Sequence, residues 1–327
     1  MPKTHQHVAA GARREVIVVI VGPTSSGKSA LAVRLAKKFN GEVVSADSRQ
    51  VYRGLNLGTG KVTKKEMGLV PHHLLDVASP RKQFAVVQYR RLALKAIKKI
   101  LQKGKLPIIC GGSGFYVQAL VDRPVIPEVK PDWQLRKRLE KKSVKELYQL
   151  LKKLDRRRAQ KIDRNNPRRL IRALEICLIT KKPVPSFKTQ PLPYPTLFLG
   201  IKTNWPILKK KIRQRLRLRI KKGLIVEVRK LRKSGLSWQK LENFGLEYRW
   251  SAKFLQQKIS GPEMVFRLTK DIEHYAQRQL TWFKKDQRIH WVKNYREAEA
   301  LTSAMISGPK LVPMRSAPYS RIIKKAA

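Results

Sequence analysis

The chain has 327 residues, enough for one large core or for a main domain with a smaller one. Its 73 Lys and Arg residues against 22 Asp and Glu give a formal charge of +51, which opposes compaction unless a polyanion offsets it. Nucleic acid is the first candidate for that partner and an anionic membrane surface the second.

Cys110 and Cys177 lie far apart in the sequence, each among apolar residues. The longest apolar run is too short to span a bilayer. With no hydrophobic signal region near the N-terminus, we expect a soluble, cytoplasmic protein with reduced thiols.

A phosphate-binding loop follows the first predicted strand. Val16–Val21 is apolar and mostly β-branched, as in a strand buried on both faces of a parallel sheet. The next residues match the pattern G-x-x-x-x-G-K-[ST] in full. An apolar helical rhythm follows over Ala30–Phe39 and ends at the stop signal Asn40-Gly41. The loop consists of Gly22, Pro23, Thr24, Ser25, Ser26, Gly27, Lys28 and Ser29.

The residue types of this loop suit a phosphorylated ligand. Glycine lets the backbone come close and take positive φ, so that several N–H groups can converge on a pyrophosphate. The helix that begins near Lys28 adds the positive end of its dipole, and Lys28 itself adds a point charge. The hydroxyl of Ser29 can ligate a phosphate-bound Mg²⁺. Because strand, loop and helix occur in the required order, we expect the chain to bind such a ligand.

A carboxylate follows the second predicted strand. The strand Gly41–Ala46 leads directly into Asp47. The carboxyl ends of parallel strands are where α/β sheets bind ligands, so Asp47 is a candidate for the same site. The alternatives for this residue are a helix N-cap, an ordinary loop carboxylate and a magnesium ligand.

A glycine-rich loop and a pair of histidines come next. Gly54–Lys61 carries too many glycines for a regular element. His72 and His73 could touch a phosphate or the nearby carboxylate of Asp76, but loop histidines are more often structural. We therefore treat them as secondary candidates.

Continued alternation of strand and helix predicts an α/β fold with a doubly wound parallel sheet of the P-loop type. An amphipathic helix over Phe84–Lys103 precedes the buried strand Leu106–Cys110, and a glycine cluster follows over Gly111–Tyr116. Such a cluster after a strand indicates close approach of backbone or ligand. The helix Tyr116–Val121 would begin near the phosphate loop, and Thr196–Lys202 is predicted to add a further strand.

A basic helical insert interrupts this sheet. The proline-spaced link Asp122–Pro131 has neither strand nor helix rhythm, and Trp133–Ile179 is helical, polar and basic. Pro167 suits the start of a helix. Three arginines in that helix have almost no acidic neighbours, which favours a phosphate-contacting face over an ordinary solvated one. They are Arg168, Arg169 and Arg172.

The most basic stretch is Trp205–Lys233, with thirteen Lys or Arg residues and one acid, Glu227. It is the strongest candidate for a helix that binds nucleic acid. Its expected apolar stripe consists of Leu208, Ile212, Leu216, Leu218 and Ile220. Its remaining surface is expected to carry Arg213, Arg215 and Arg219 beside the lysines.

The C-terminal part is predicted to hold a turn, a long helix and a last strand. Glu242–Arg249 contains the turn, and Phe266–Phe283 is a helix whose aromatic residues are more often core than a stacking surface for bases. A short strand ends at Val292, and the segment from Ser303 onward is expected to be disordered. The expected organisation is a disordered N-terminus 1–14, a first core part 15–123, a basic helical insert 124–193, a second core part 194–297 and a disordered tail 298–327.

The residues alone support phosphoryl transfer or nucleic-acid-stimulated NTP hydrolysis. No apolar run ending in Asp-Glu follows the third strand, which weighs against the hydrolase. A small-molecule or nucleoside kinase would consume ATP and form a phosphorylated product. A basic RNA-binding scaffold that only senses a nucleotide would bind RNA and leave it unchanged.

A set of motifs in fixed order resembles the bacterial tRNA dimethylallyltransferase family. The segments are GPTSSGKSALA, VVSADSRQVYRGLNLGTGK, PHHLLDV, PIICGGSGFYVQAL, NNPRRLIRALE and YAQRQLTWF, between about Val16 and Val292. The phosphate loop alone would be shared with many kinases, so the combination carries the resemblance. Plant-type adenylate isopentenyltransferases share the early motifs without the same need for a basic tRNA-binding insert.

The resemblance implies transfer of a dimethylallyl group from dimethylallyl diphosphate to N6 of adenosine-37 in tRNAs that read codons beginning with U. The products would be N6-dimethylallyladenosine and pyrophosphate. It also implies Mg²⁺ as cofactor, the anticodon stem-loop of tRNA as partner, a monomeric enzyme and no membrane association. The phosphate loop would then hold the leaving group and not ATP.

Individual roles also follow from the resemblance. Asp47 would hydrogen-bond the adenine N6 and take its proton, Ser113 would lie beside the substrate, and Arg215 would reach the diphosphate. Thr24 and Lys28 would contact the diphosphate, and Ser29 the metal. The residues expected to bind tRNA are Asp47, Ser48, Arg49, Gln50, Ser113, Arg136, Arg168, Arg169, Leu170, Ile171 and Arg172. The sequence departs from the family pattern near Gly245, which leaves the roles of Tyr248 and Arg249 open.

Overall fold

A computed structural model describes residues 15–68, 70–127, 129–186 and 189–308. The chain divides into two units. Among the described residues, the first combines 15–120 with 192–308, and the second holds Val121–Pro191. The second unit corresponds to the predicted insert 124–193. The predictions for 1–14 and for 309–327 fall outside the described residues.

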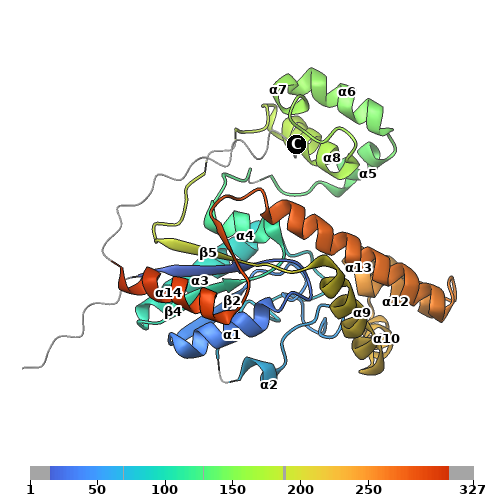
Figure 1. Ribbon diagram of the computed structural model, residues 1–327. Coiled ribbons are helices and arrows are strands. Elements are labelled where there is room, and N and C mark those ends of the chain that lie inside the picture. The colour runs from blue at the N-terminus through green and yellow to red at the C-terminus, as the bar shows by residue number, and fades with distance from the viewer. Residues whose placement is uncertain (1–14, 69, 128, 187–188, 309–327) are drawn as a thin grey trace, which may run out of the picture. The chain divides into compact units, whose positions relative to one another are not determined.

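The first unit is built on a parallel sheet (Figure 1). Its strand order is β3-β2-β4-β1-β5-β6. The strands are β1 (Ile17–Val21), β2 (Gly41–Ser45), β3 (His72–His73), β4 (Leu106–Cys110), β5 (Thr196–Ile201) and β6 (Ile289–Val292). Every residue of β1 and β4 is buried, as their aliphatic sequences predict for strands covered on both faces. The doubly wound parallel α/β fold is thereby confirmed.

The strand register brings three loops together. Ile20 and Ser45 both pair with Cys110, so β1, β2 and β4 end at the same level of the sheet. The first residue after β4 touches both neighbours, because Gly111 N donates to the carbonyl of Ile20 at 3.1 Å. A Cβ at Gly111 would lie 2.1 Å from the carbonyl oxygen of Ala46, which explains the glycine. The loops after β1, β2 and β4 therefore leave the sheet side by side.

Helices cover both faces of the sheet. The helices that alternate with its strands are α1 (Lys28–Lys38), α2 (Lys64–Met67), α3 (Val86–Gln102), α4 (Gly114–Val121) and α14 (Tyr295–Ser307). Leu35 of α1 and Ala298 of α14 share one apolar cluster with Val18 and Ile20 of β1. Figure 1 shows α4 across the sheet from α1. This two-sided cover is what allows the sheet to carry aliphatic residues on both faces.

The tail prediction is wrong for residues 298–307. This segment forms most of α14, with Ala298 and Thr302 buried. Leu301, Met305 and Ile306 pack against the apolar cluster of the sheet. The helix is stable because it covers a face of the sheet, and that contact is not visible in the weakly patterned sequence of the segment.

A group of helices follows β5 in the chain. They are α9 (Trp205–Lys221), α10 (Leu224–Lys233), α11 (Trp238–Phe244), α12 (Leu246–Leu255) and α13 (Gly261–Phe283). Figure 1 shows α9, α10, α12 and α13 close together beside the sheet. The basic stretch is divided into α9 and α10 at Gly223, with φ 100°, and the predicted turn lies at Gly245, with φ 78°. Both positions need the positive φ that glycine adopts readily.

The second unit is helical, as predicted. It contains α5 (Trp133–Glu140), α6 (Val144–Leu154), α7 (Arg156–Ala159) and α8 (Pro167–Thr180). Leu147, Leu151, Leu170 and Leu174 form the centre of its apolar core. The Asn166 side chain accepts a hydrogen bond from Arg169 N, and Pro167 opens α8, so the predicted helix start is confirmed.

Two smaller expectations are met within the described residues. Cys110 and Cys177 are buried and form no disulfide. Burial raises the pKa of the Cys110 thiol to about 11, so this thiol stays protonated at neutral pH. In the part of the chain that the structure describes, every helix is too short or too polar to span a membrane.

Candidate active site

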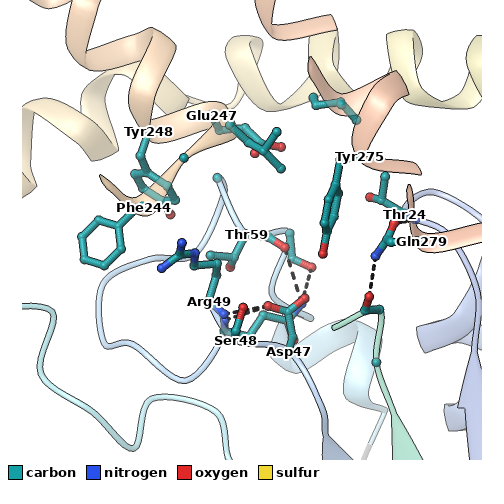
Figure 2. Close-up of a pocket in the computed structure, with 18 of the residues that line it drawn as sticks. Thr24, Asp47, Ser48, Arg49, Thr59, Phe244, Glu247, Tyr248, Tyr275 and Gln279 are labelled. Atoms are coloured by element: carbon teal, nitrogen blue, oxygen red, sulfur yellow. Dashed lines mark hydrogen bonds between the residues drawn. The ribbon is translucent and has the colours of Figure 1, made fainter. Parts of the chain in front are cut away.

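A cavity of about 460 Å³ opens at the carboxyl ends of β1, β2 and β4. The loops after these strands form one wall, and α9, α12 and α13 form the other. Figure 2 shows Asp47 and Ser48 below Tyr275, with Thr24 and Gln279 at one side. The predicted site residues on the wall are Thr24, Lys28, Ser29, Asp47, Ser48, Arg49, Gln50 and Arg215.

The phosphate loop has the backbone that its sequence predicts. Gly22 and Gly27 take φ 145° and φ 97°, and Ser25 also takes a positive φ of 62°. α1 begins at Lys28, and no side chain caps the N–H groups of its first turn. Uncapped N–H groups together with the helix dipole make this end of α1 a site for an anion.

Lys28 folds back onto its own loop. Its Nζ donates to the carbonyl oxygen of Pro23 at 2.6 Å. Desolvation lowers the pKa of Lys28 to about 8, and the nearby Arg215 adds to this effect. An anion in the cavity would favour the charged form of the lysine and reverse this shift. Lys28 is therefore poised to gain interaction energy from a phosphate.

Gln279 of α13 joins two strand-end loops, a role that the sequence did not reveal. Its Oε1 accepts from Thr24 N at 2.7 Å, and its Nε2 donates to the carbonyl oxygen of Gly112 at 2.8 Å (Figure 2). One buried amide thus fixes the phosphate loop against the glycine cluster after β4. The segment YAQRQLTWF contains Gln279, but nothing in the segment itself indicates the partners of a polar side chain on a helix.

Asp47 shapes the turn after β2 and faces the cavity. Its Oδ1 accepts from Arg49 N at 2.8 Å and from Gln50 N at 3.2 Å. The carboxylate therefore makes the turn-capping contacts expected of an ordinary loop aspartate. It also lines the cavity, as the position at the end of a parallel strand predicts.

Ser113 supports this turn from the next strand. Its hydroxyl accepts from Ser48 N at 3.0 Å and forms a hydrogen bond with Tyr275. Burial raises the pKa of Tyr275 well above its ordinary value, so its hydroxyl stays protonated. Ser113 itself is not on the wall; it holds Ser48 and Tyr275, which are.

Two arginines from α9 reach the cavity. Arg219 forms an ion pair with buried Glu247 and donates to the carbonyl oxygen of Gly58 at 3.5 Å. Arg215 donates to the carbonyl oxygen of Gly60 at 3.3 Å. Burial, and then the charge of Arg219, lower the pKa of Arg215 to about 10. Positive charge is therefore concentrated on this side of the cavity and disfavoured there until an anion binds.

The predicted faces of α9 need correction near its C-terminal end. Arg219 was expected on the surface and Leu218 in the apolar stripe, but Arg219 is buried and Leu218 is 56% exposed. The buried face continues from Leu208, Ile212 and Leu216 to Arg219, at helical spacing. An arginine in a helix is normally assigned to the surface from its sequence. The predicted apolar face is therefore wrong where α9 meets the cavity, because an arginine is buried there.

The roles of the aromatic residues are mixed. Phe283 is core, Tyr275 lines the cavity, and Phe266 is 64% exposed, so the expectation of a core stripe along α13 holds only in part. Phe244 and Tyr248 also line the cavity, and Figure 2 shows them on the side away from Gln279. Burial raises the pKa of Tyr248 well above its ordinary value, so it remains a hydrogen-bond donor.

The sequence is similar to proteins of one known family. Residues 50–286 match the model of a family described as IPP transferase. The chain belongs to the IPP transferase family. The tRNA dimethylallyltransferase of Acetivibrio thermocellus is 38% identical over 284 residues, which cover 84% of this chain and 91% of that protein. That of Caldanaerobacter subterraneus subsp. tengcongensis is 39% identical over 297 residues, covering 87% and 94%.

Solved structures agree with this family. The full-length tRNA isopentenylpyrophosphate transferase of Bacillus halodurans has a TM-score of 0.68 and 34% identity, and the match covers 90% of this chain and 97% of that one. A eukaryotic dimethylallyltransferase described as acting on tRNA has a TM-score of 0.75 at 24% identity, covering 95% and 84%. The second likeness shows the fold alone.

In the helical unit of this family member, two predicted tRNA-binding arginines hold a buried glutamate. Nε and Nη2 of Arg136 donate to the two oxygens of Glu175 at 2.8 and 2.7 Å, and Arg172 donates to Oε2. Burial alone would raise the pKa of Glu175, but hydrogen bonds from Arg136, Arg172 and Asp132 N hold it below its ordinary value. Arg136 and Arg172 thus neutralise an internal charge.

The rest of the predicted arginine run is divided between surface and core. Arg168 and Arg169 are exposed in the first turn of α8. Leu170 and Ile171 are 0% and 7% exposed and belong to the apolar core of the unit. Their side chains cannot contact RNA, which corrects the expectation for these two residues. Adjacent positions on a helix point in different directions, so a contiguous run cannot form one face.

The two histidines have structural partners. His72 Nδ1 lies 2.8 Å from the carbonyl oxygen of Val70, and His73 Nε2 lies 2.7 Å from Oε2 of Glu42. Asp76 pairs instead with Lys61 at 2.6 Å. Neither histidine lines the cavity. The structural alternative for this pair is confirmed.

The expected Mg²⁺ can be tested against the donors present. The Ser29 hydroxyl and the Asp47 carboxylate line the same cavity. Mg²⁺ commonly takes one or two protein oxygens beside phosphate oxygens and water, so this donor set fits a metal carried in with a diphosphate. Among the described residues, no group of three or more His, Cys, Asp or Glu could hold a metal by itself.

Proposed function

We propose that this chain transfers the dimethylallyl group of dimethylallyl diphosphate to N6 of adenosine-37 in tRNAs that read codons beginning with U. The products are N6-dimethylallyladenosine and pyrophosphate. One observation carries the proposal: a phosphate loop and a strand-end carboxylate face the same cavity in a member of the IPP transferase family. The cavity offers a place for each reactant.

The diphosphate of the donor fits the phosphate loop. Lys28 and Arg215 line the cavity, and α1 begins at Lys28 within the phosphate loop. Negative charge grows on the leaving oxygen as the C–O bond breaks, so fixed positive groups stabilise the transition state more than the ground state. Mg²⁺ held by Ser29 and phosphate oxygens would add positive charge to the same leaving group. Thr24 completes this contact surface.

Asp47 is the group proposed to act on the acceptor. The N6 lone pair of the adenine forms the new bond to the dimethylallyl carbon, and the pair from the broken C–O bond leaves with pyrophosphate. The proton lost from N6 passes to the Asp47 carboxylate. A positioned general base of this kind contributes about 10²–10⁴-fold in rate. Ser113 assists by holding the Ser48 backbone beside it.

The acceptor base must leave its stack to enter the cavity. The half-buried Tyr275 supplies a ring surface for it within a wall that also holds Arg49 and Gln50. We assign backbone phosphates of the anticodon arm to the exposed arginines Arg168 and Arg169. We also propose a monomeric enzyme, and a tRNA substrate favours a cytoplasmic one.

The decisive experiment follows the dimethylallyl label. The protein would be incubated with Mg²⁺, labelled dimethylallyl diphosphate and unmodified tRNA with adenosine at positions 36 to 38. The controls are the Asp47→Ala protein and a transcript with guanosine at position 37. Label on the intact tRNA with wild-type protein alone supports the proposal. ATP consumption with a phosphorylated product would instead favour a kinase, and tRNA binding without any modification would favour a scaffold.

A further inference from the structure

The single acid of the most basic stretch receives four hydrogen bonds. Oε2 of Glu227, on α10, accepts from Asn56 N at 3.2 Å and from Leu57 N at 2.7 Å. Oε1 accepts from Gly58 N at 3.1 Å and from the hydroxyl of Tyr248 at 2.8 Å. Consecutive backbone N–H groups that converge in this way form an anion-binding turn. The anion in this turn is a side chain from a distant helix.

The loop that Glu227 holds is pressed against three cavity side chains. A Cβ at Gly58 would lie 2.5 Å from the Tyr248 ring. A Cβ at Gly60 would lie 1.9 Å from Nη2 of Arg219 and 2.2 Å from Nη2 of Arg215. A side chain at Gly58 would clash with this ring, and one at Gly60 would displace the ends of the two arginines. A small shift of the loop therefore moves its neighbours.

The same loop supplies the hydrogen-bond acceptors of the two arginines. The carbonyl oxygen of Gly58 accepts from Arg219, and that of Gly60 accepts from Arg215. Glu227 is not on the cavity wall, whereas Gly58, Thr59 and Gly60 are. The loop is thus the link between a carboxylate outside the cavity and two guanidinium groups inside it.

We infer that Glu227 is a positioning residue: it fixes the loop Asn56–Gly60 and, through it, the guanidinium group of Arg215, which faces the donor's diphosphate, and that of the neighbouring Arg219. The inference rests on the proposed function in assigning Arg215 to the diphosphate. A carboxylate is required because it only accepts hydrogen bonds. An amide in its place would turn an N–H₂ group toward backbone N–H donors and release part of the loop.

The test compares Glu227→Gln and Glu227→Asp with the matched control Glu263→Gln. Glutamine keeps the size and loses an acceptor, whereas aspartate keeps the charge and loses reach. Glu263 forms a partly exposed ion pair with Arg267 on α13 and lies outside the cavity wall. Three quantities are measured: the Kd for inorganic pyrophosphate with Mg²⁺ by calorimetry, the steady-state constants of dimethylallyl transfer, and amide hydrogen exchange at Asn56–Gly58.

We expect both Glu227 variants to raise the KM for dimethylallyl diphosphate and the Kd for pyrophosphate on the order of tenfold, as when a group that orients ligand-binding residues is lost. The KM for tRNA should stay within about twofold of wild type. A simple loss of folded enzyme would lower the apparent kcat and leave KM and Kd unchanged, so a rise in these two constants reports the loop. Exchange at the three amides should accelerate in both variants and not in Glu263→Gln.

Either of two results would overturn the inference. One is a folded variant with faster loop exchange but unchanged KM and Kd, which would make Glu227 purely structural. The other is unchanged exchange at Asn56–Gly58. The proposed function fails separately, if wild-type protein transfers no dimethylallyl group. In that case a Glu227-dependent Kd for pyrophosphate would still support the positioning role. Glu227→Asp keeps the test decisive if Glu227→Gln does not fold.

Discussion

Two buried glutamates, one in each unit, are surrounded by arginines in opposite ways. In the helical unit, Glu175 accepts hydrogen bonds from both Arg136 and Arg172, so its carboxylate is fully paired. At the cavity, Glu247 pairs with Arg219, while Arg215 has only a carbonyl acceptor and no carboxylate within ion-pair distance among the described residues.

The pKa shifts follow this difference. Arginine donors hold the pKa of Glu175 below its ordinary value despite burial, whereas burial raises the pKa of Glu247 and lowers that of Arg215. Each arginine of the helical cluster has a carboxylate partner, whereas Arg215 at the cavity has only a carbonyl acceptor among the described residues. A count of basic residues therefore does not show which ones can bind an anion; their partners do.

Substituting one arginine in each cluster by methionine gives the strongest test of this difference. Arg215→Met should lower kcat/KM for dimethylallyl diphosphate about 100- to 1000-fold, because a charge that stabilises the leaving group is lost. Arg172→Met should keep kcat near wild type in the folded fraction and lower the stability of its unit. Steady-state kinetics and urea unfolding measure the two effects. The contrast fails if both variants lose activity equally.

Removing the acid of the helical cluster should cost stability. Glu175→Gln leaves Arg136 and Arg172 without their counter-charge, and we expect about 3 kcal/mol of destabilisation. Urea unfolding with hydrogen exchange across α5 and α8 reports it. The control is Glu146→Gln, which disturbs only an exposed capping box and should cost much less stability. Equal losses in the two variants would mean that the cluster adds no more than a cap.

A third paired glutamate predicts acid sensitivity. Burial alone would raise the pKa of Glu42, but hydrogen bonds from His73, Lys105 and Lys103 lower it from 4.5 to about 2. A depressed carboxyl pKa contributes stability above pH 4.5 that is lost as pH falls toward 2. We expect this part to be about 2 kcal/mol. Urea unfolding at stepped pH should show an acid loss in wild type that is reduced in Glu42→Gln.

The smallest expected effect is the pH dependence of ligand binding at Lys28. Its pKa is lowered to about 8 before a ligand binds, so the ammonium is lost as pH rises through that value. The Kd for pyrophosphate should then rise by up to about tenfold per pH unit above pH 8. In Lys28→Arg the step should vanish, because arginine stays charged. Any step common to both proteins belongs to pyrophosphate itself.

The sequence by itself determined the sheet, the helical insert and the strand-end part of the candidate site. Glycine positions, β-branched runs and helical periods are local signals, and they predicted the parallel sheet, the phosphate loop, the helical insert and Asp47 at a strand end. These predictions succeed because each depends on residues close together in the chain. The helix within 298–307 was missed because its stability comes from packing on the sheet.

Only the tertiary structure decided which polar residues meet. Gln279 binds the phosphate loop across 255 positions, and Glu227 holds Leu57 across 170. Arg219 turns inward to Glu247, and Arg136 and Arg172 turn to Glu175. A polar side chain on a helix looks solvent-exposed in the sequence, whichever way it faces. Its role depends on the partner that folding brings to it, because burial of a charge is tolerated only where such a partner lies.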